Sequence, residues 1–364
     1  MRTSAQFHIL ILFFLLAQEI FSQFNFYSDY LLIYDDNIYN NYLNTSDLIN
    51  NFSLGSAYNF ESDVNNLQFY YEGALGEYSK NKFKSFNSHK LGIVNTHLFG
   101  DDFNPLNAGV NYSFRNNKDE FIIYNFRQLS AYVNYRHSFQ ETNFLIGGYI
   151  FYRNEYPNFT VFSNYEHKAF LKWISNFETL TSLMLSAEFN YKKYLENYNY
   201  EGYANDGSYL KFLINIGHSL SEKTGINLFA SVRKNFNEKS RYIVSDSLIF
   251  YEEEIFNDLY SFNSVEAGIG FTQILGDDFK LSSEIRYSPK YFTSLYAADE
   301  FGIELPELRE DKQLSFGFSL EYDMEKILRG LSASVTYNFI KNESNDYYYD
   351  YSNQIYSFTI GYGF

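Results

Sequence analysis

The sequence predicts an all-β fold: a closed transmembrane antiparallel β-barrel of about 16 strands, in a range of roughly 14 to 18. Three observations predict it: short segments alternate apolar and polar residues, many apolar series end in Tyr or Phe, and the connections alternate in length. Beyond residue 22 no apolar run approaches the ~20 residues that a membrane-spanning helix needs. Any crossing of a membrane must therefore use strands.

The alternation has the period of a two-faced strand. In segment 182–192, Leu183, Leu185, Ala187, Phe189 and Tyr191 alternate with polar residues. The same pattern recurs in 106–115, 210–216, 226–232, 265–271, 314–322 and 331–339. The first strand and the segments 88–99 and 166–177 alternate less regularly, which leaves the strand number open by two.

Aromatic residues favour a membrane barrel over a soluble sandwich. The chain has 37 Tyr and 39 Phe against one Trp, and many apolar series end in them, as at Tyr112, Phe114, Tyr191 and Tyr337. Aromatic residues at strand ends form the interfacial girdles of membrane barrels. In a soluble sandwich they would more often occupy the middle of the core.

The connections alternate between short and long, which is the asymmetry of periplasmic turns and extracellular loops. The short ones lie near 61–63, 101–105, 140–142, 178–179, 221–223, 276–278 and 325–327. The long ones lie near 36–46, 79–87, 116–126, 154–165, 195–207, 237–259, 290–311 and 341–352. Seven turns and eight loops give 16 strands.

Residues 1–22 have the three zones of a secretory signal peptide. Arg2 supplies the positive start, Ile9 to Ala17 the apolar stretch, and Ser22 a small residue before a cleavage point at Gln23. A membrane anchor is the alternative, but the apolar stretch is short for one. We therefore expect two parts: a signal peptide over 1–22 and a barrel domain over 23–364.

Charge and composition exclude several functions. The net charge of −16 disfavours nucleic acid as a partner, because such binding needs clustered Lys and Arg. The chain has no Cys, hence no disulfide and no thiolate metal site. His89, His97, His137, His167 and His218 show no metal-ligand spacing, and no Ser lies in a G-x-S-x-G motif. We predict no cofactor, no metal site and no enzymatic activity.

The last segment, Gln354 to Phe364, places five apolar residues on one face: Tyr356, Phe358, Ile360, Tyr362 and Phe364. A final strand of this kind resembles the assembly signal of Gram-negative outer-membrane barrels. The resemblance is to porin-like barrels as a class and covers the mature chain through patterning rather than through a motif. It implies an outer-membrane location, contact with lipid, and recognition by the barrel-assembly machinery. The alternative is an ordinary edge strand that ends in Phe.

The polar face should line the lumen if the apolar face meets lipid. This assignment points ten cations inward: Arg115, Arg136, Arg153, Lys168, Lys172, Lys192, Lys211, Arg233, Lys280 and Arg286. It points five acids inward: Glu72, Glu188, Glu266, Glu284 and Glu321. The surplus acid would then lie in loops, at 252–254, 299–300, 307–311 and 346–350. Alternatively, lumen charges pair across strands and only stabilise the wall.

The sequence thus predicts a porin-like channel for passive or weakly selective diffusion of small polar solutes or ions, with a leaning toward anions. One alternative is a surface adhesin or binding barrel that displays long acidic, Tyr-rich loops. Another is an accessory barrel of a secretion or transport complex. The solute and the oligomeric state are left open.

Overall fold

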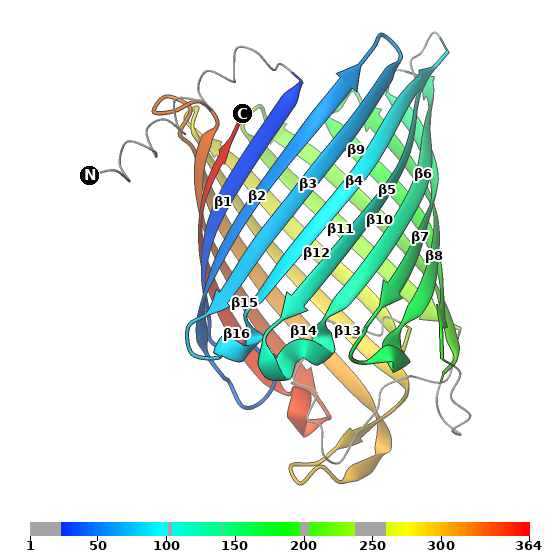
Figure 1. The fold of residues 1–364 in the computed structure, drawn as a ribbon, viewed down its shortest axis with the longest axis vertical. Coiled ribbons are helices and arrows are strands. Elements are labelled where there is room, and N and C mark those ends of the chain that lie inside the picture. The colour runs from blue at the N-terminus through cyan, green and yellow to red at the C-terminus, as the bar shows by residue number, and fades with distance from the viewer. Residues whose placement is uncertain (1–22, 101–103, 141, 197–203, 237–259) are drawn as a thin grey trace.

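The computed structural model describes residues 23–100, 104–140, 142–196, 204–236 and 260–364, which form a tall barrel (Figure 1). The expected signal peptide and the acidic run 252–254 lie outside the described residues.

Within the described residues, sixteen antiparallel strands form one closed sheet in which each strand pairs with its neighbours in the chain and β1 pairs with β16. This confirms the predicted fold class and strand number. The strands are β1 Phe24–Asp35, β2 Asp47–Glu61, β3 Asn65–Tyr78, β4 Phe86–Phe99, β5 Asn104–Asn117, β6 Phe126–Gln140, β7 Asn143–Glu155, β8 Asn164–Phe177, β9 Thr181–Tyr194, β10 Asp206–Ser221, β11 Thr224–Asn235, β12 Phe262–Leu275, β13 Phe279–Ala298, β14 Glu304–Asp323, β15 Leu331–Ser344 and β16 Tyr351–Gly363.

One face of the sheet is an apolar band around the outside of the barrel. Residues directly opposite each other in antiparallel strands share a face, so the pairing of Leu185 with Ile214, of Ile214 with Ala230 and of Ala230 with Ala267 traces this band across four strands. Leu185 and Ile214 keep 38% and 39% of their surface exposed. An apolar outer band of this extent on a closed sheet is stable in contact with lipid rather than with water.

The strands that alternate irregularly in sequence, β1, β4 and β8, pair over their length like the others. Their inward face carries apolar residues: Leu31 lies opposite Asn51, Val94 opposite Gly109, and Phe170 opposite Gly148. These inward apolar residues interrupt the alternation of apolar and polar residues in the sequence, although the strand itself continues.

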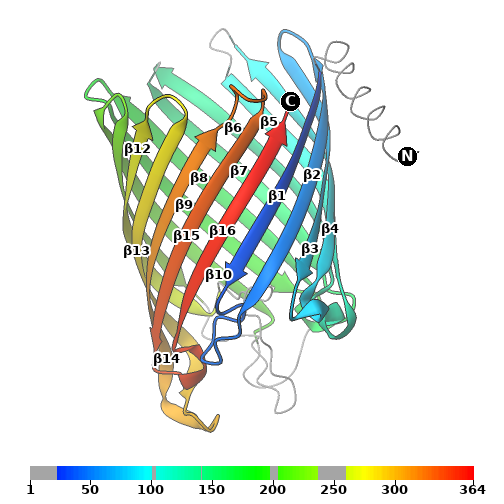
Figure 2. The same ribbon diagram turned by 90° about the vertical axis from the view of Figure 1, so that its left-hand side faces the viewer.

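The two ends of the barrel differ, as Figures 1 and 2 show: tight turns lie at the end where β16 terminates, and the longer connections and the 3₁₀ segments lie at the other end. The hairpin of β13 and β14 projects furthest (Figure 2). The prediction of a loop over 290–311 is wrong for most of its length, because both strands run for 20 residues and only 299–303 connect them. Pairs such as Tyr291 with Glu310 continue the ladder past two register shifts.

Four 3₁₀ segments lie at the long-loop end: η1 Lys82–Lys84, η2 Asp119–Tyr124, η3 Thr160–Phe162 and η4 Tyr347–Tyr349. The first two pack together through Phe83 and Phe121, whose ring centroids are 5.2 Å apart. Val161, Phe162 and Tyr194 form a buried cluster there. Lys84 is buried with its ammonium 4.2 Å from the ring centroid of Tyr39. In the described part of the chain, no helix is long and apolar enough to cross a membrane.

Candidate functional site

The inner wall of the barrel is the face opposite the apolar band. Pairing places fourteen of the fifteen charged residues assigned to the lumen on this face, and Arg153 is the exception. Lys211, for example, lies opposite Glu188 on one side and Arg233 on the other. Lys280 lies opposite Glu321.

Arg153 corrects the face assignment. It lies opposite Leu129 and Tyr165, on the same face as Tyr149, which is 40% exposed in the apolar band. Its guanidinium is 2.5 Å from the carboxylate of Glu155. The segment from Leu145 onward has apolar residues at both parities, so its pattern did not distinguish the two faces.

Many inward charges pair across the wall, as the alternative interpretation of the lining expects. The ammonium of Lys168 is 2.7 Å from the carboxylate of Glu188. Arg286 contacts Glu266 at 3.1 Å and Glu284 at 2.6 Å. The pairs Lys90–Glu72 and Lys280–Glu321 are both 3.2 Å apart.

Other inward cations lie against aromatic rings. The guanidinium carbon of Arg115 is 3.8 Å from the ring centroid of Phe86, and that of Arg233 is 5.1 Å from the centroid of Tyr209. Arg136 lies over Phe144, Lys172 over Phe170, and Lys192 over Tyr260. Such contacts attract a cation through the ring quadrupole and hold it along the wall.

Sequence reasoning missed several inward charges. They are the cations Lys90, Lys290 and Arg309, and acids that include Asp29, Asp35, Asp47, Glu166, Asp311 and Asp323. They were missed because β1 and β4 alternate irregularly and because 290–311 was assigned to a loop. As a result, cations outnumber acids only on the described inward face of β5–β11, and acids outnumber cations on the remaining strands. One half of the wall is basic and the other acidic.

Aromatic rings on the inner wall lie over glycines of the neighbouring strand. At Gly92, a Cβ atom would be 2.4 Å from two ring carbons of Tyr70, its direct cross-strand partner. The same arrangement joins Tyr27 to Gly55, Phe86 to Gly76, Tyr132 to Gly109, Phe170 to Gly148, and Phe229 to Gly268. Because the glycine has no side chain, each ring lies against the backbone of the neighbouring strand.

A recess of about 820 Å³ lies near the short-turn end of the barrel. Asp29, Lys280, Glu321, Ser334 and Thr359 contribute to its lining, and all lie on the inward face. Its lining holds charges of both signs beside apolar residues such as Phe279 and Leu331.

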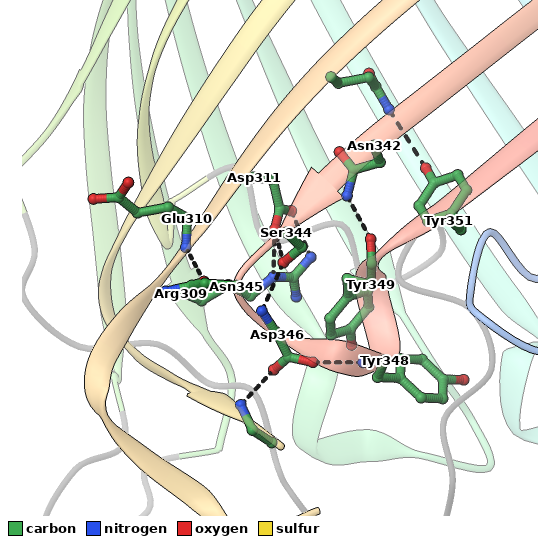
Figure 3. Close-up of polar contacts among 12 residues, drawn as sticks. Arg309, Glu310, Asp311, Asn342, Ser344, Asn345, Asp346, Tyr348, Tyr349 and Tyr351 are labelled. Atoms are coloured by element: carbon green, nitrogen blue, oxygen red, sulfur yellow. Dashed lines mark hydrogen bonds and ion pairs between the residues drawn. The ribbon is translucent and has the colours of Figure 1, made fainter. Parts of the chain in front are cut away.

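At the opposite end, a buried ion pair anchors the projecting hairpin (Figure 3). Arg309 and Asp311, 3% and 2% exposed, share two hydrogen bonds: Nε donates to Oδ1 at 3.0 Å and Nη2 to Oδ2 at 2.6 Å. The guanidinium carbon is 3.3 Å from the ring centroid of Tyr349, and Ser344 donates to Asp311 at 2.7 Å. We call Arg309, Asp311, Ser344, Asp346 and Tyr349 the rim clamp.

Asp346 completes the rim clamp by accepting hydrogen bonds from two segments. Its carboxylate accepts from the backbone N–H of Tyr348 at 3.0 Å and from that of Ala298 at 3.1 Å (Figure 3). Burial raises the pKa of this carboxyl above its ordinary value, although Arg309 acts in the opposite direction. The clamp thus ties the connection between β15 and β16 to the hairpin of β13 and β14.

The five histidines beyond residue 22 lie near strand ends on the outer face. His89 bonds to the hydroxyl of Tyr71 at 2.7 Å, and His167 to that of Tyr149 at 2.5 Å. His97 bonds to Asn65, His218 bonds to Thr181, and His137 stacks on Tyr135. Among the described residues, no group of three or more His, Cys, Asp or Glu could hold a metal ion.

Solved structures that resemble this barrel include proteins described as outer-membrane proteins, such as OprD of Pseudomonas aeruginosa. OccK8 (OprE) of Pseudomonas aeruginosa matches with a TM-score of 0.51 and 12% identity, covering 94% of this chain and 97% of that one. The chain shares this barrel fold. OccAB4 of Acinetobacter baumannii gives 0.53 and 11%, over 94% and 97%, and a bacterial polysaccharide outer membrane secretin gives 0.53 and 9%, over 94% and 98%. No protein-family model and no curated protein matches the sequence.

Proposed function

We propose that this protein is a porin-like outer-membrane channel through which small polar solutes or ions diffuse passively or with weak selectivity. The observation that carries the proposal is the inner wall: a charged, polar lining whose rings lie over glycines instead of standing in the lumen. A 16-stranded barrel is wide enough to leave an aqueous path if side chains do not fill it. The protein needs no catalytic group for this role.

Selectivity would come from the two unlike halves of the wall. On β5–β11, Arg115, Arg136, Lys172 and Lys192 lie against rings. Charges on low-dielectric walls focus their field into the lumen, whereas loop acids beyond a Debye length of ~8 Å at physiological salt are screened. We infer a mild anion preference that fades as salt rises. It is weaker than the sequence predicted, because the acids missed in the sequence offset the predicted surplus over the described wall as a whole, and only β5–β11 keep an excess of cations.

Planar-bilayer recording tests both parts of the proposal. We expect discrete conductance steps and, across a salt gradient, a reversal potential that favours the anion. Arg136→Glu or Arg286→Glu should shift this potential toward the cation, whereas Lys312→Glu, on the outer face, should leave it unchanged. A silent barrel would refute the channel. Cation preference in the unmodified protein, or no shift in either lumen variant, would refute the anion assignment.

The second candidate function is a binding barrel, and the projecting hairpin favours it. Phe301 and Ile303 at its tip are 78% and 62% exposed, next to Asp299 and Glu304, and the rim clamp fixes the hairpin in place. Exposed apolar residues held on a rigid element are typical of contact surfaces. A display scaffold with a filled lumen would show no conductance, so the same recording separates the two functions.

Location and assembly belong to the same proposal. We propose that residues 1–22 are removed before Gln23 and that the final strand is read by the barrel-assembly machinery. In support of this, Tyr356, Phe358, Ile360 and Tyr362 share the outer face, where the ring centroids of Tyr356 and Tyr337 are 4.9 Å apart. N-terminal sequencing of the protein from isolated outer membranes should begin near Gln23. A soluble periplasmic protein obtained without detergent would refute the location.

A further inference from the structure

The outer face of β7–β9 carries a basic row at the long-loop end. Arg153 on β7 lies opposite Tyr165 on β8, which lies opposite Lys193 on β9. Adjacent strands are about 4.8 Å apart, so the two cations flank the tyrosine with Cα atoms roughly 10 Å apart. Both cations are exposed. Their long side chains can reach one anion held above the ring of Tyr165.

Charges around this row leave it basic. Arg127 on β6 lies opposite Glu155, which also contacts Arg153, and Asp206 lies opposite Lys193. Three cations therefore face two acids within this patch. On the far side of the barrel the outward cations are matched one to one: Lys312 lies opposite Glu343, and Lys341 contacts Asp350 at 3.1 Å.

An aromatic layer lies immediately below the basic row. His167, two residues deeper on β8 than Tyr165, bonds to the Tyr149 hydroxyl and has the rings of Phe151 and Tyr191 at 5.3 and 6.1 Å. Such rings lie at the level where headgroups meet acyl chains. The basic row is thus at headgroup height.

An apolar groove of about 450 Å³ lies deeper on the same face. Its lining includes Trp173, Phe212 and Val232 together with the small residues Ala187 and Ala230. Leu171, also in its lining, is six residues from Tyr165 along β8. Six residues span about 20 Å of strand, which a tilt of about 40° reduces to roughly 15 Å of depth, or half of the ~30 Å hydrocarbon core. An acyl chain of the adjoining leaflet reaches this depth.

We propose that the outer face of β7–β11 is a binding site for one phosphorylated lipid of the outer leaflet. Arg153 and Lys193 bind its phosphate over Tyr165, and an acyl chain lies in the groove between Trp173 and Phe212. Exposed cations beside a membrane surface attract anionic headgroups. The basic row selects for charge, and the groove selects for a lipid over a free anion.

Native mass spectrometry of the detergent-solubilised barrel tests this site with three probes: dipalmitoyl phosphatidic acid, dipalmitoylglycerol and inorganic phosphate. We expect phosphatidic acid to bind at least tenfold more tightly than dipalmitoylglycerol. Arg153→Gln combined with Lys193→Gln should remove that difference. Lys312→Gln combined with Lys341→Gln, the matched control on the far side, should preserve it. Ala187→Phe should weaken binding by filling the groove.

Three results would overturn the proposal. Equal binding of dipalmitoylglycerol would show that the cations do not select the ligand. Displacement of phosphatidic acid by equimolar inorganic phosphate would identify a free-anion site. A dimer in sedimentation equilibrium that Ala187→Phe dissociates would show that a second copy of the chain occupies the groove. Heat-modifiable migration on gels confirms that each variant is a folded barrel before it is measured.

Discussion

Replacing Gly92 by alanine tests the role of the glycine–ring pairs. The new Cβ would be 2.4 Å from Tyr70, whereas ordinary contact begins near 3.4 Å, so the ring must withdraw by at least 1 Å. The clashing atoms are Cε1, Cζ and Oη, the far end of the side chain, which can move by rotation. We therefore expect the Tyr70 ring to turn off the wall and narrow the lumen.

The free energy of unfolding should change little, because two effects oppose each other. If about 40 Å² of ring surface leaves the wall, the loss is about 1 kcal/mol. Lys90, 5.2 Å from the centroid of the same ring, loses a contact of about 0.5 to 1 kcal/mol at an exposed site. Alanine in place of glycine within a strand returns about 0.5 to 1 kcal/mol. The net cost is about 0.5 to 1.5 kcal/mol.

Single-channel conductance is the assay. Gly92→Ala should lower the conductance step, and adding Tyr70→Ala should restore it. Gly270→Ala is the control, because its Cβ would meet no atom closer than 3.7 Å. The control should keep the conductance and gain about 0.5 to 1 kcal/mol of stability. If Gly92→Ala and Gly270→Ala have equal conductance, the reasoning about the rings is refuted.

Three further predictions concern the membrane face, the rim clamp and assembly. Leu185→Arg should destabilise the barrel by about 2 to 4 kcal/mol in a denaturant titration and Ser186→Arg by much less, and equal effects would contradict the assigned faces. Arg309→Met should cost about 3 to 5 kcal/mol by leaving Asp311 buried without its cation, seen as faster proteolysis of the hairpin; a hairpin that stays resistant would argue against the clamp. Deleting Phe364 should lower the yield of heat-modifiable barrel, whereas an unchanged yield would exclude a recognition signal.

The sequence predicted those features of the barrel that a period of two can encode. Leu183 to Tyr191 alternate cleanly, and their face follows from hydropathy alone. Hydropathy does not predict the face of Arg153, because Ile146 and Ile150 on the inner wall are as apolar as Leu145 on the outer face. A local pattern cannot distinguish an apolar lumen position from a lipid-facing one.

Features that depend on strand register could not be predicted from the sequence. Tyr70 lies over Gly92 only because strands β3 and β4 align those two residues, and no local motif records that alignment. The length of β13 and β14 was missed for a related reason. Polar residues such as Glu310 mark exposure to water, and a strand that continues into water has the composition of a loop.

The seam between β1 and β16 gives the barrel a strict order of completion. Each of the other pairings joins strands that are consecutive in the chain, whereas the seam joins segments as distant as Phe26 and Phe364, whose backbones share two hydrogen bonds of 2.9 Å. Hairpins of consecutive strands can form before the whole chain has folded. The sheet stays open, with two unpaired edges, until β16 pairs with β1. Lengthening a connection changes the closure entropy only slowly, so insertions in the outer loops should be tolerated, while loss of β16 leaves the wall without its closing strand.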